Sequence, residues 1–483
     1  MFDSQPSDFA SSIVPRASTP ELQPSWWALV RDAVRGVETD LTRAPIGRAL
    51  TILAVPMIIE MLMESVFAMV DVFWVAHLGA NAVATVGLTE SMMMIVYSVA
   101  MGMSIGAMAL VARRVGEKDT AAAARTATQA ILLGASFAAA IGVAGAVFAP
   151  RLLALMGATP EVVANGSAFA QVMLGGNATA FLLFMINAIF RGAGDAVFAM
   201  RVLWVGNLLN IALGPLFIFG LGPIPALGVT GAAVATNLGR GCAVLFQLYL
   251  LTSGRSRIRL SLRQLGLDFR VMGSVLSLSS SATFQMLVSM TSYIGVMRIL
   301  STFGSAPLAG YTIGFRILMF ALLPTFGLAN AAATLVGQNL GAKQPERAEQ
   351  SVWRACFVSA AFLSLIGVAF VLGAPSMVRL FTQDPAVSHH AISYLRIVSL
   401  GFPFYAFGMV LSQSFNGAGD TRTPTWINVL VFWVMQIPLA WGLARQAALG
   451  PSGVFITLAV CFSVFAALSL VLFRRGTWKE TRV

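Results

Sequence analysis

The 483-residue chain is 57% hydrophobic and only 11% charged, whereas soluble domains carry about 25% charged residues, so a soluble enzyme or binding domain is excluded. A net charge of +11 would suggest nucleic acid for a soluble protein, but here the basic residues lie in short loops between apolar spans, which is a pattern of membrane topology. We therefore expect no nucleic-acid partner. Cys242, Cys356 and Cys461 lie in apolar spans and predict no disulfide, metal site or cofactor.

The N-terminal residues 1–47 are mainly polar and lack the regions of a signal peptide. Trp26 and Trp27 beside Arg31 and Arg35 predict either a short interfacial helix or a loose tail with some surface affinity. Twelve apolar segments follow that are long enough to cross a bilayer as helices. They lie near residues 50–77, 84–111, 126–149, 162–189, 198–220, 228–252, 272–301, 308–337, 351–374, 388–414, 424–444 and 453–473.

The basic residues of the loops predict the orientation of these helices. They cluster in the second, sixth and eighth connections and in the C-terminal tail: Arg113, Arg114, Lys118 and Arg125; Arg255, Arg257, Arg259, Arg263 and Arg270; Lys343 and Arg347; Arg474, Arg475 and Lys479. Because positive loops stay in the cytoplasm, we expect both termini there, in a multi-pass protein of the cell's inner membrane.

An internal repeat relates the two halves at a constant offset of 225 residues. Gly79 corresponds to Gly304, Lys118 to Lys343, and the GAGD run at 192–195 to that at 417–420. Each unit holds six spans, so both halves enter the membrane in the same sense. We predict an all-α membrane protein of two six-helix bundles related by pseudo-two-fold symmetry. Its parts are a cytoplasmic tail (1–47), an N-lobe (48–252), a basic cytoplasmic linker (253–270), a C-lobe (271–473) and a C-terminal tail (474–483).

The first span carries three carboxylates, Glu60, Glu64 and Asp71. At about 100° per residue they share one helix face. A charge at mid-bilayer costs roughly 2.5–3.5 kcal/mol on insertion scales. A helix that carries three such carboxylates is expected to face other helices or water, and the protons of these carboxylates are expected to have a function.

Four stretches occur in order, and two of them have counterparts in the second half. They are VDVFWVAHLGANAVATVGL at 70–88; ALVARRVGEKD at 109–119 with ATLVGQNLGAK at 333–343; FRGAGDAVFAM at 190–200 with FNGAGDTRTP at 415–424; and NLLNIALGPLFIFGLG with ALGVTGAAVAT between 207 and 236. Together they resemble the multidrug and toxic compound extrusion (MATE) family, most closely its DinF-type branch. The resemblance implies a MATE-type fold and secondary active export of lipophilic, often cationic compounds, driven by H⁺ or Na⁺.

The resemblance also implies roles for single residues. Asp71 matches the family's coupling-ion aspartate, and Asn210 and Thr236 match its partners on the fifth and sixth helices. The aspartate expected four residues after Asn210 is Gly214 here. Glu60 and Glu64 are therefore the candidates to replace it. The positions of the C-lobe carboxylates in the NorM-type branch are taken by Gln285 and Tyr405, and residues 272–301, 308–337, 351–374, 388–414, 424–444 and 453–473 contain no Asp or Glu.

Further candidates complete the predicted site. Glu90, in the second span, is either a further coupling carboxylate or a solvated interfacial glutamate. Candidates for the substrate cavity are Asn207, Gln285, Phe284, Met290, Tyr293 and Trp433, because amides, methionine and aromatic rings suit varied amphipathic cations. Asp195 and Asp420 are expected to cap the helices that follow them and to pair with Arg191 or Arg422.

The hypothesis is a monomeric H⁺-coupled antiporter, not an enzyme, that exports lipophilic cations by alternating access. Pro56 offers a hinge in its first helix. Two transport alternatives are an Na⁺-coupled exporter and a flippase for a lipid-linked precursor. A different class, a membrane scaffold or receptor, gives no use for the carboxylates. No P-loop, dinucleotide fingerprint or catalytic triad occurs in the sequence.

Overall fold

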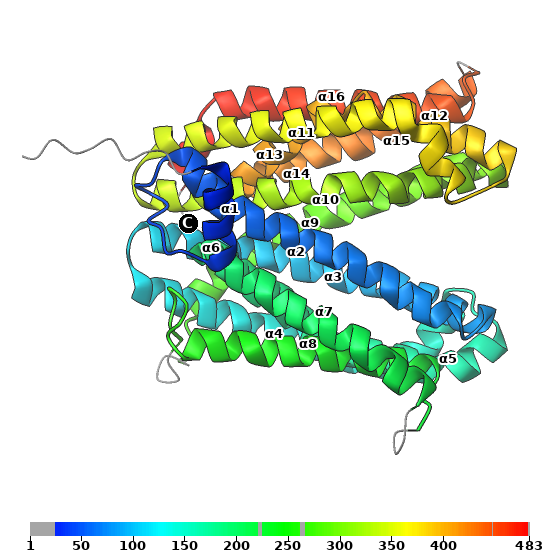
Figure 1. Ribbon diagram of the computed structural model, residues 1–483, viewed down its shortest axis with the longest axis horizontal. Helices are drawn as coiled ribbons and strands as arrows, with labels where there is room; N and C mark the ends of the chain where they lie inside the picture. Colours follow the sequence, from blue (N-terminus) through cyan, green and yellow to red (C-terminus); the bar gives the residue numbers. More distant parts are fainter. Residues whose placement is uncertain (1–24, 221–224, 261–265, 447, 482–483) are drawn as a thin grey trace, which may run out of the picture.

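A computed structural model describes residues 25–220, 225–260, 266–446 and 448–481. Within these residues the regular structure is entirely helical (Figure 1). The elements are α1 (Trp26–Arg35), α2 (Ile46–Ala76), α3 (Ala80–Gly116), α4 (Thr120–Leu155), α5 (Pro160–Gly175), α6 (Asn177–Ala193), α7 (Ala196–Phe219), α8 (Val229–Thr252), α9 (Phe269–Ser301), α10 (Ser305–Gly341), α11 (Pro345–Arg379), α12 (Pro385–Ser399), α13 (Phe402–Ala418), α14 (Arg422–Asn428), η2 (Val429–Met435), α15 (Gln436–Trp441), η3 (Gly442–Gln446), α16 (Pro451–Arg474) and η4 (Thr477–Glu480).

The number of membrane spans agrees with the prediction. Eleven helical segments of the described residues are long and apolar enough to cross a bilayer, and α12 with α13 gives a twelfth, bent by 60°. In the first half, α5 and α6 form one such segment. α11 begins at Pro345, earlier than predicted, so that Glu346 and Glu349 lie in its first two turns.

The helix boundaries reproduce the 225-residue repeat. α3 and α10, and likewise α6 and α13, begin and end at corresponding residues. The turns repeat as well, because Lys118 and Lys343 both adopt left-handed backbone conformations, with φ of 61° and 59°. Such conformations are uncommon outside glycine, so their recurrence indicates a common backbone path in the two halves.

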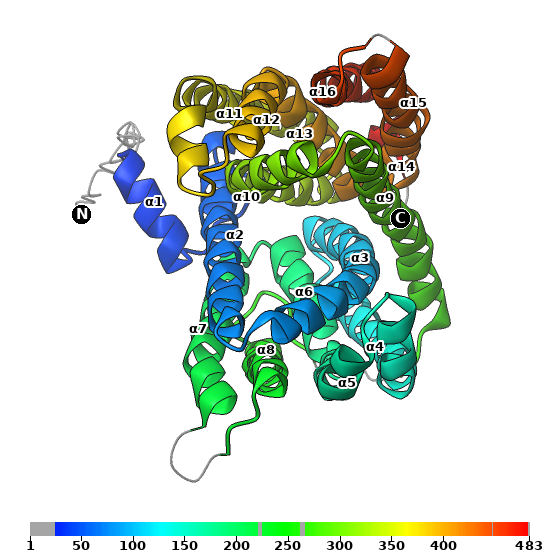
Figure 2. The same cartoon turned by 90° about the vertical axis from the view of Figure 1, so that its right-hand side faces the viewer.

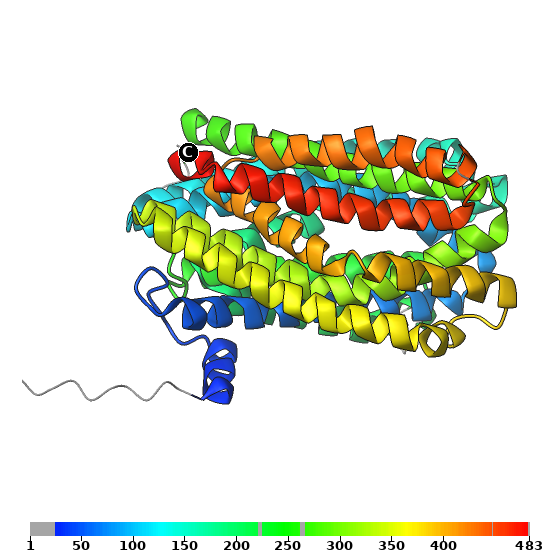
Figure 3. The ribbon, with the colours of Figure 1, turned by 90° about the horizontal axis from the view of Figure 1, so that it is seen from above.

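The two halves form two adjacent helical bundles. In Figure 1, α2–α8 (blue to green) lie below α10–α16 (yellow to red). Figure 2 views the molecule along its helices, with α2 and α3 facing α10 and α9 across the middle. Figure 3 shows how α11 and α16 extend along the length of the second bundle. The bundle interiors are apolar, with Phe181 and Met185 buried in the first and Leu395 and Phe402 in the second.

The bundles approach each other closely at one end, which we call the basic end because Arg113, Arg114, Lys118 and Lys343 lie there. A Cβ atom added to Gly116 would lie 2.0 Å from the carbonyl oxygen of Gln338, and one added to Gly341 would lie 2.2 Å from that of Arg113. Only glycine permits so close an approach. These repeat-related glycines therefore let α3 and α10 seal the basic end.

The segment before α2 ties both bundles together at the basic end. Leu41 is buried, and its carbonyl oxygen accepts a hydrogen bond of 3.1 Å from Nη2 of Arg347 in α11. The same nitrogen donates to the carbonyl oxygen of Ala44. From the linker after α8, Nη2 of Arg257 donates to the carbonyl oxygen of Thr39 at 2.9 Å. The segment at 37–44 thus bridges the two halves.

The tail after α16 makes a second bridge. Trp478 is fully buried and stacks on Phe473, with ring centroids 4.7 Å apart. Three residues later, the carbonyl oxygen of Thr481 accepts a 2.8 Å hydrogen bond from Nη2 of Arg113 in α3. The tail therefore joins the last span to the first bundle.

The crossing glycines lead to a first prediction. Replacing Gly116 with leucine should force α3 and α10 apart, because overpacking of this kind costs about 1–3 kcal/mol. We expect Gly116→Leu to lower the unfolding temperature in detergent and to increase thiol labelling of a cysteine introduced at the buried Ala112. Gly87→Leu is the matched control in the same helix, since a Cβ there meets nothing within 4 Å. Equal stability and labelling of the two variants would contradict the proposed seal.

Candidate functional site

The candidate site lies inside the first bundle, around the carboxylates of α2. Glu60 is only 2% exposed. Its Oε1 atom accepts hydrogen bonds from Nη1 of Arg191 at 2.9 Å and from Nδ2 of Asn187 at 3.2 Å. Both partners come from α6, where residues four apart lie on the same face. A buried ion pair between α2 and α6 is the result.

Gln247 of α8 extends this pair into a network. Its Nε2 atom donates to Oδ1 of Asn187 at 2.7 Å and to the carbonyl oxygen of Leu183 at 3.2 Å. Two atoms of the ion pair, Oε2 of Glu60 and Nε of Arg191, have no hydrogen-bond partner within the described residues. Unsatisfied polar atoms are costly in a low-dielectric interior, so these two atoms are where the network can take a further polar partner.

A second polar layer joins α2, α7 and α8. Nδ2 of Asn207 donates to Oε2 of Glu64 at 3.4 Å, and Nδ2 of Asn210 donates to Oγ1 of Thr236 at 2.9 Å. The structure thus brings the three predicted polar residues of α7 and α8 into the same bundle interior as the α2 glutamates. Asp71, the expected partner of Asn210, belongs to α2, but its side chain lies outside the described residues.

The position of Gly214 faces a tryptophan of α2. A Cβ atom added there would lie 3.6 Å from Cδ1 of Trp74. The buried Nε1 atom of that indole has no hydrogen-bond partner in the described part of the chain. Glu60 and Glu64 contact α6 and Asn207 instead, so neither lies beside the position where the family has its second aspartate.

These contacts also fix the register of α2 against α7. Glu64 lies beside Asn207, and Trp74 lies beside Gly214, so the two helices run parallel. Position 71 of the α2 backbone therefore lies alongside the segment of α7 between Asn210 and Gly214. Glu90 is exposed on α3.

Sequence reasoning gave no role to Arg240 of α8. Its Nη1 atom donates to the Tyr97 hydroxyl at 3.0 Å, and its guanidinium lies 6.0 Å from the Phe67 ring centre and 5.7 Å from that of Tyr97. Cations over aromatic faces are stabilised by the ring quadrupole. An isolated arginine inside an apolar span was the signal that could have identified it.

The expected pairing of Asp195 with Arg191 is wrong, because Arg191 binds Glu60. Asp195 binds the linker instead: it accepts hydrogen bonds from Oγ of Ser256 at 2.7 Å and the backbone N–H of Arg257 at 2.8 Å, and pairs with Nε of Arg257 at 3.3 Å. Burial raises the pKa of Asp195 despite these contacts. Its side chain accepts no capping hydrogen bond from the backbone of α7, so the expected cap is not formed.

Asp420 does stabilise the start of its helix as expected. It accepts from the Thr423 backbone N–H at 3.1 Å and from the Thr423 hydroxyl at 2.6 Å. No ion pair with Arg422 is formed within the described residues.

The substrate-cavity candidates of the second half lie on different faces of α9. Gln285 is buried, and its Nε2 donates to Oγ of Ser412 at 3.4 Å. Met290 faces the first bundle, where its sulfur accepts from Oγ of Ser98 at 3.6 Å. Tyr293 joins an aromatic cluster, its ring centre 4.7 Å from that of Phe315.

Phe284 of α9 and Trp433 of η2 are exposed. Their exposed fractions are 54% and 48%, and Nε1 of Trp433 donates to Oγ1 of Thr291 at 3.0 Å. The structure therefore does not gather the second-half candidates around one space.

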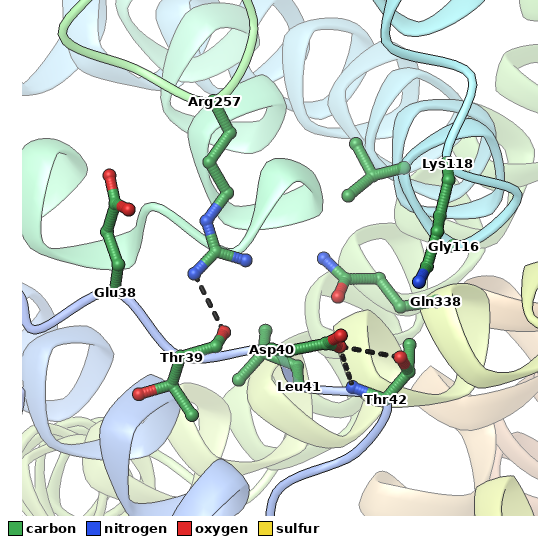
Figure 4. A pocket seen from close by; sticks show the side chains of 10 residues that line it. Glu38, Thr39, Asp40, Leu41, Thr42, Gly116, Lys118, Arg257 and Gln338 are labelled. Atoms are coloured by element: carbon green, nitrogen blue, oxygen red, sulfur yellow. Dashed lines mark hydrogen bonds between the residues drawn. The ribbon is translucent and has the colours of Figure 1, made fainter. Parts of the chain in front are cut away.

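A pocket of about 370 Å³ opens at the basic end (Figure 4). Glu38 and Asp40 face Lys118 and Arg257 across it, so acids and bases balance. A hydrogen bond of 2.6 Å from the Thr42 hydroxyl holds the pKa of Asp40 below its ordinary value. This pocket belongs to the bridge formed by residues 37–44 and has no charge preference of its own.

Comparison with known proteins identifies the family. The MatE family model matches residues 56–216 and again residues 281–441, two segments separated by the offset of the internal repeat. A probable multidrug resistance protein NorM from Thermotoga maritima is 26% identical over 442 residues, covering 91% of this chain and 94% of the relative. An FAD transporter from Shewanella oneidensis is 24% identical and covers 83% of this chain and 88% of the relative.

Solved structures agree with this result. The outward-facing structure of a multidrug resistance MATE family transporter of the MOP superfamily superimposes with a TM-score of 0.85 at 28% identity, covering 91% of this chain and 98% of that one. Because the family model matches both halves at the offset of the internal repeat, and solved MATE structures superimpose on the two bundles, the chain is a membrane transporter of the MATE family.

Proposed function

We propose that this transporter exports amphipathic, mainly cationic compounds in exchange for protons, by alternating access between its two bundles. The names of its multidrug-resistance relatives support the export of varied compounds. The basic loops support an inner-membrane location with both termini in the cytoplasm. We expect it to work as a monomer, with H⁺ as the coupling ion and no cofactor.

The observation that carries the proposal is the ion pair between Glu60 and Arg191. It crosses from α2 to α6 inside the membrane-spanning part, and each partner retains one unpaired polar atom among the described residues. A proton on Glu60 would remove the charge that holds Arg191. The side-chain link between α2 and α6 would then weaken, which would favour a shift of α2. Proton binding and helix position are coupled in this way.

Asp71 remains the primary coupling carboxylate of the proposal, on the strength of the family match. Its position in α2, alongside α7 between Asn210 and Gly214, is consistent with help from Asn210 and Thr236. Glu64 and Glu90 are further carboxylates, which would raise the number of protons exchanged per transport cycle above one if they also titrate.

The seal at the basic end fits the same cycle. With both termini in the cytoplasm, the Gly116–Gly341 crossing closes the path on the cytoplasmic side. Export then requires α3 and α10 to part at these glycines so that a compound enters, and to close again before it leaves. The segment at 37–44 and the tail after α16 must release one bundle at that step.

Charge distribution favours cationic over anionic cargo. Arg191 is neutralised by Glu60 and Arg240 is engaged by aromatic groups, so the first bundle has no prominent anion site. A flippase for a pyrophosphate-linked lipid, or transport of an anion such as the FAD of the Shewanella relative, would need one. Sodium coupling is the other alternative. The second bundle does not favour it, because the carboxylates of α11, Glu346 and Glu349, lie in the first turns of that helix and not at mid-span.

Transport in proteoliposomes tests coupling directly. We expect efflux of a cationic dye to follow an imposed pH gradient and to stop in Asp71→Asn and Glu60→Gln, because neither variant can exchange a proton at that position. Separate sodium gradients should have no effect. The control is Glu480→Gln, an exposed carboxylate outside the spans. Sodium-driven efflux, or normal pH-driven efflux in both variants, would refute the proposal.

A double-mutant cycle separates coupling from stability at the ion pair. Removing one partner of a buried pair costs about 3–5 kcal/mol, because the other charge stays buried. We therefore expect Glu60→Gln and Arg191→Gln to lower unfolding stability in detergent, and the double variant Glu60→Gln/Arg191→Gln to recover most of it. The double variant should still not transport with a pH gradient. If it is stable and transports normally, the pair is structural only.

A further inference from the structure

The C-terminal half has an open groove at the place where the N-terminal half is covered by α1. In the first half, α1 ends against the seam between α2 and α7. Nη2 of Arg201 in α7 donates to the carbonyl oxygens of Val34 and Arg35 at 3.3 and 3.0 Å. A Cβ atom added to Gly36 would touch Val197 at 3.4 Å.

The 225-residue offset maps Val197 and Arg201 onto Arg422 and Trp426 of α14. These residues line a groove of about 460 Å³ between α14 and α9, together with Ser280, Ser281, Phe284, Thr425 and Val429. No described segment covers it. Figure 2 shows α1 beside α2 on one side of the molecule and α9 with α14 on the opposite side. The repeat therefore reproduces the groove between the two helices, but among the described residues no helix equivalent to α1 lies over it in the second half.

The groove has a fixed floor and exposed apolar walls. Oγ1 of Thr425 donates to the carbonyl oxygen of Ser281 at 2.9 Å and ties the two helices together. Phe284 of α9 and Trp426 of α14 form the two sides of the groove, with exposed fractions of 54% and 66%. Ser280 and Phe284 are four residues apart on α9, as Arg422 and Trp426 are on α14, so each helix presents one polar and one aromatic residue on the same face.

The polar end of the groove is positively charged. Arg422 is exposed at the start of α14, near the basic end, and no carboxylate lies within 4.0 Å of its nitrogens among the described residues. The nearest acid in sequence, Asp420, is occupied by Thr423. A guanidinium next to two aromatic side chains fits an amphipathic anion. The guanidinium binds phosphate oxygens well, and tryptophan favours the membrane interface.

We propose that this groove is a binding site for one anionic phospholipid of the leaflet at the basic end. Its phosphate binds Arg422, and its acyl chains run along Phe284 and Trp426. The lipid takes the place that α1 takes in the first half. Basic sites between membrane helices bind acidic headgroups in this manner. The proposal requires only that the chain spans a membrane and is independent of the coupling ion.

Brominated lipids test the site, since bromine quenches only nearby tryptophan. The purified full-length protein in nanodiscs should be quenched more by brominated phosphatidylglycerol than by brominated phosphatidylcholine. Trp426→Phe should remove most of this excess. Arg422→Gln should weaken the apparent affinity for phosphatidylglycerol about tenfold. Arg475→Gln, which removes an exposed charge at the same end, should leave it unchanged.

Other outcomes overturn the proposal. Equal quenching by the two lipids, or an excess that persists in Arg422→Gln, would show that no selective site exists there. Loss of the excess on addition of inorganic phosphate would show that the groove binds the free anion rather than a lipid. Native mass spectrometry gives a second readout: the wild type should retain one more phosphatidylglycerol than Arg422→Gln, and equal numbers would refute the site even if one variant were less stable.

Discussion

A carboxylate in a membrane-spanning helix must find its counter-charge inside the protein, and much of the first bundle is arranged around that requirement. Glu60 is matched by Arg191 and Asn187 from α6, and Gln247 from α8 supports Asn187. One residue of α2 thus dictates the identity of side chains on two other helices. Neutral contacts such as the 3.0 Å hydrogen bond from Thr179 Oγ1 of α6 to Asn237 Oδ1 of α8 also join these helices, so the ion pair marks the place where helix position depends on charge.

The two halves share a backbone and differ in chemistry. The shared part includes helix lengths, left-handed turns and the glycines at the α3–α10 crossing. The differences are concentrated in side chains: ion pairs and amide networks inside the first bundle, and neutral amide, hydroxyl and aromatic contacts in the second. Under the proposed proton coupling, a symmetric scaffold in which only one half carries mid-span carboxylates gives a direct way to move one bundle relative to the other.

The fold could be predicted from the sequence because its signals are local or periodic. Span lengths follow from bilayer thickness, and the repeat follows from a constant offset in Gly, Lys and Asp. Partner choice could not be predicted in the same way. Arg191 follows Glu60 by more than a hundred residues and lies beside an equally plausible acid, Asp195, four residues away in sequence. Only the placement of α2 and α6 in the bundle, which brings the Arg191 side chain to Glu60, decides between them.

The candidates on α9 show the same limit. Gln285, Met290 and Tyr293 are close in sequence, yet helical rotation sends them to three different neighbours. Likewise, the missing aspartate at Gly214 suggested a replacement carboxylate, whereas the neighbour is the bulky indole of Trp74. The residue types of a span indicate what chemistry it carries, but the rotation and register of the helix determine which neighbours those side chains contact.

The contact between Arg113 and Thr481 has a consequence for biosynthesis. Arg113 lies in the second span, and Thr481 follows the last one. During translation the ribosome must therefore complete all spans before this contact can form, and Trp478 can be buried only at that stage. Until then α3 has its own bundle but lacks its final partner at the basic end. Newly inserted chains should consequently pass through a period in which both bundles are formed and the closure of the basic end is still incomplete.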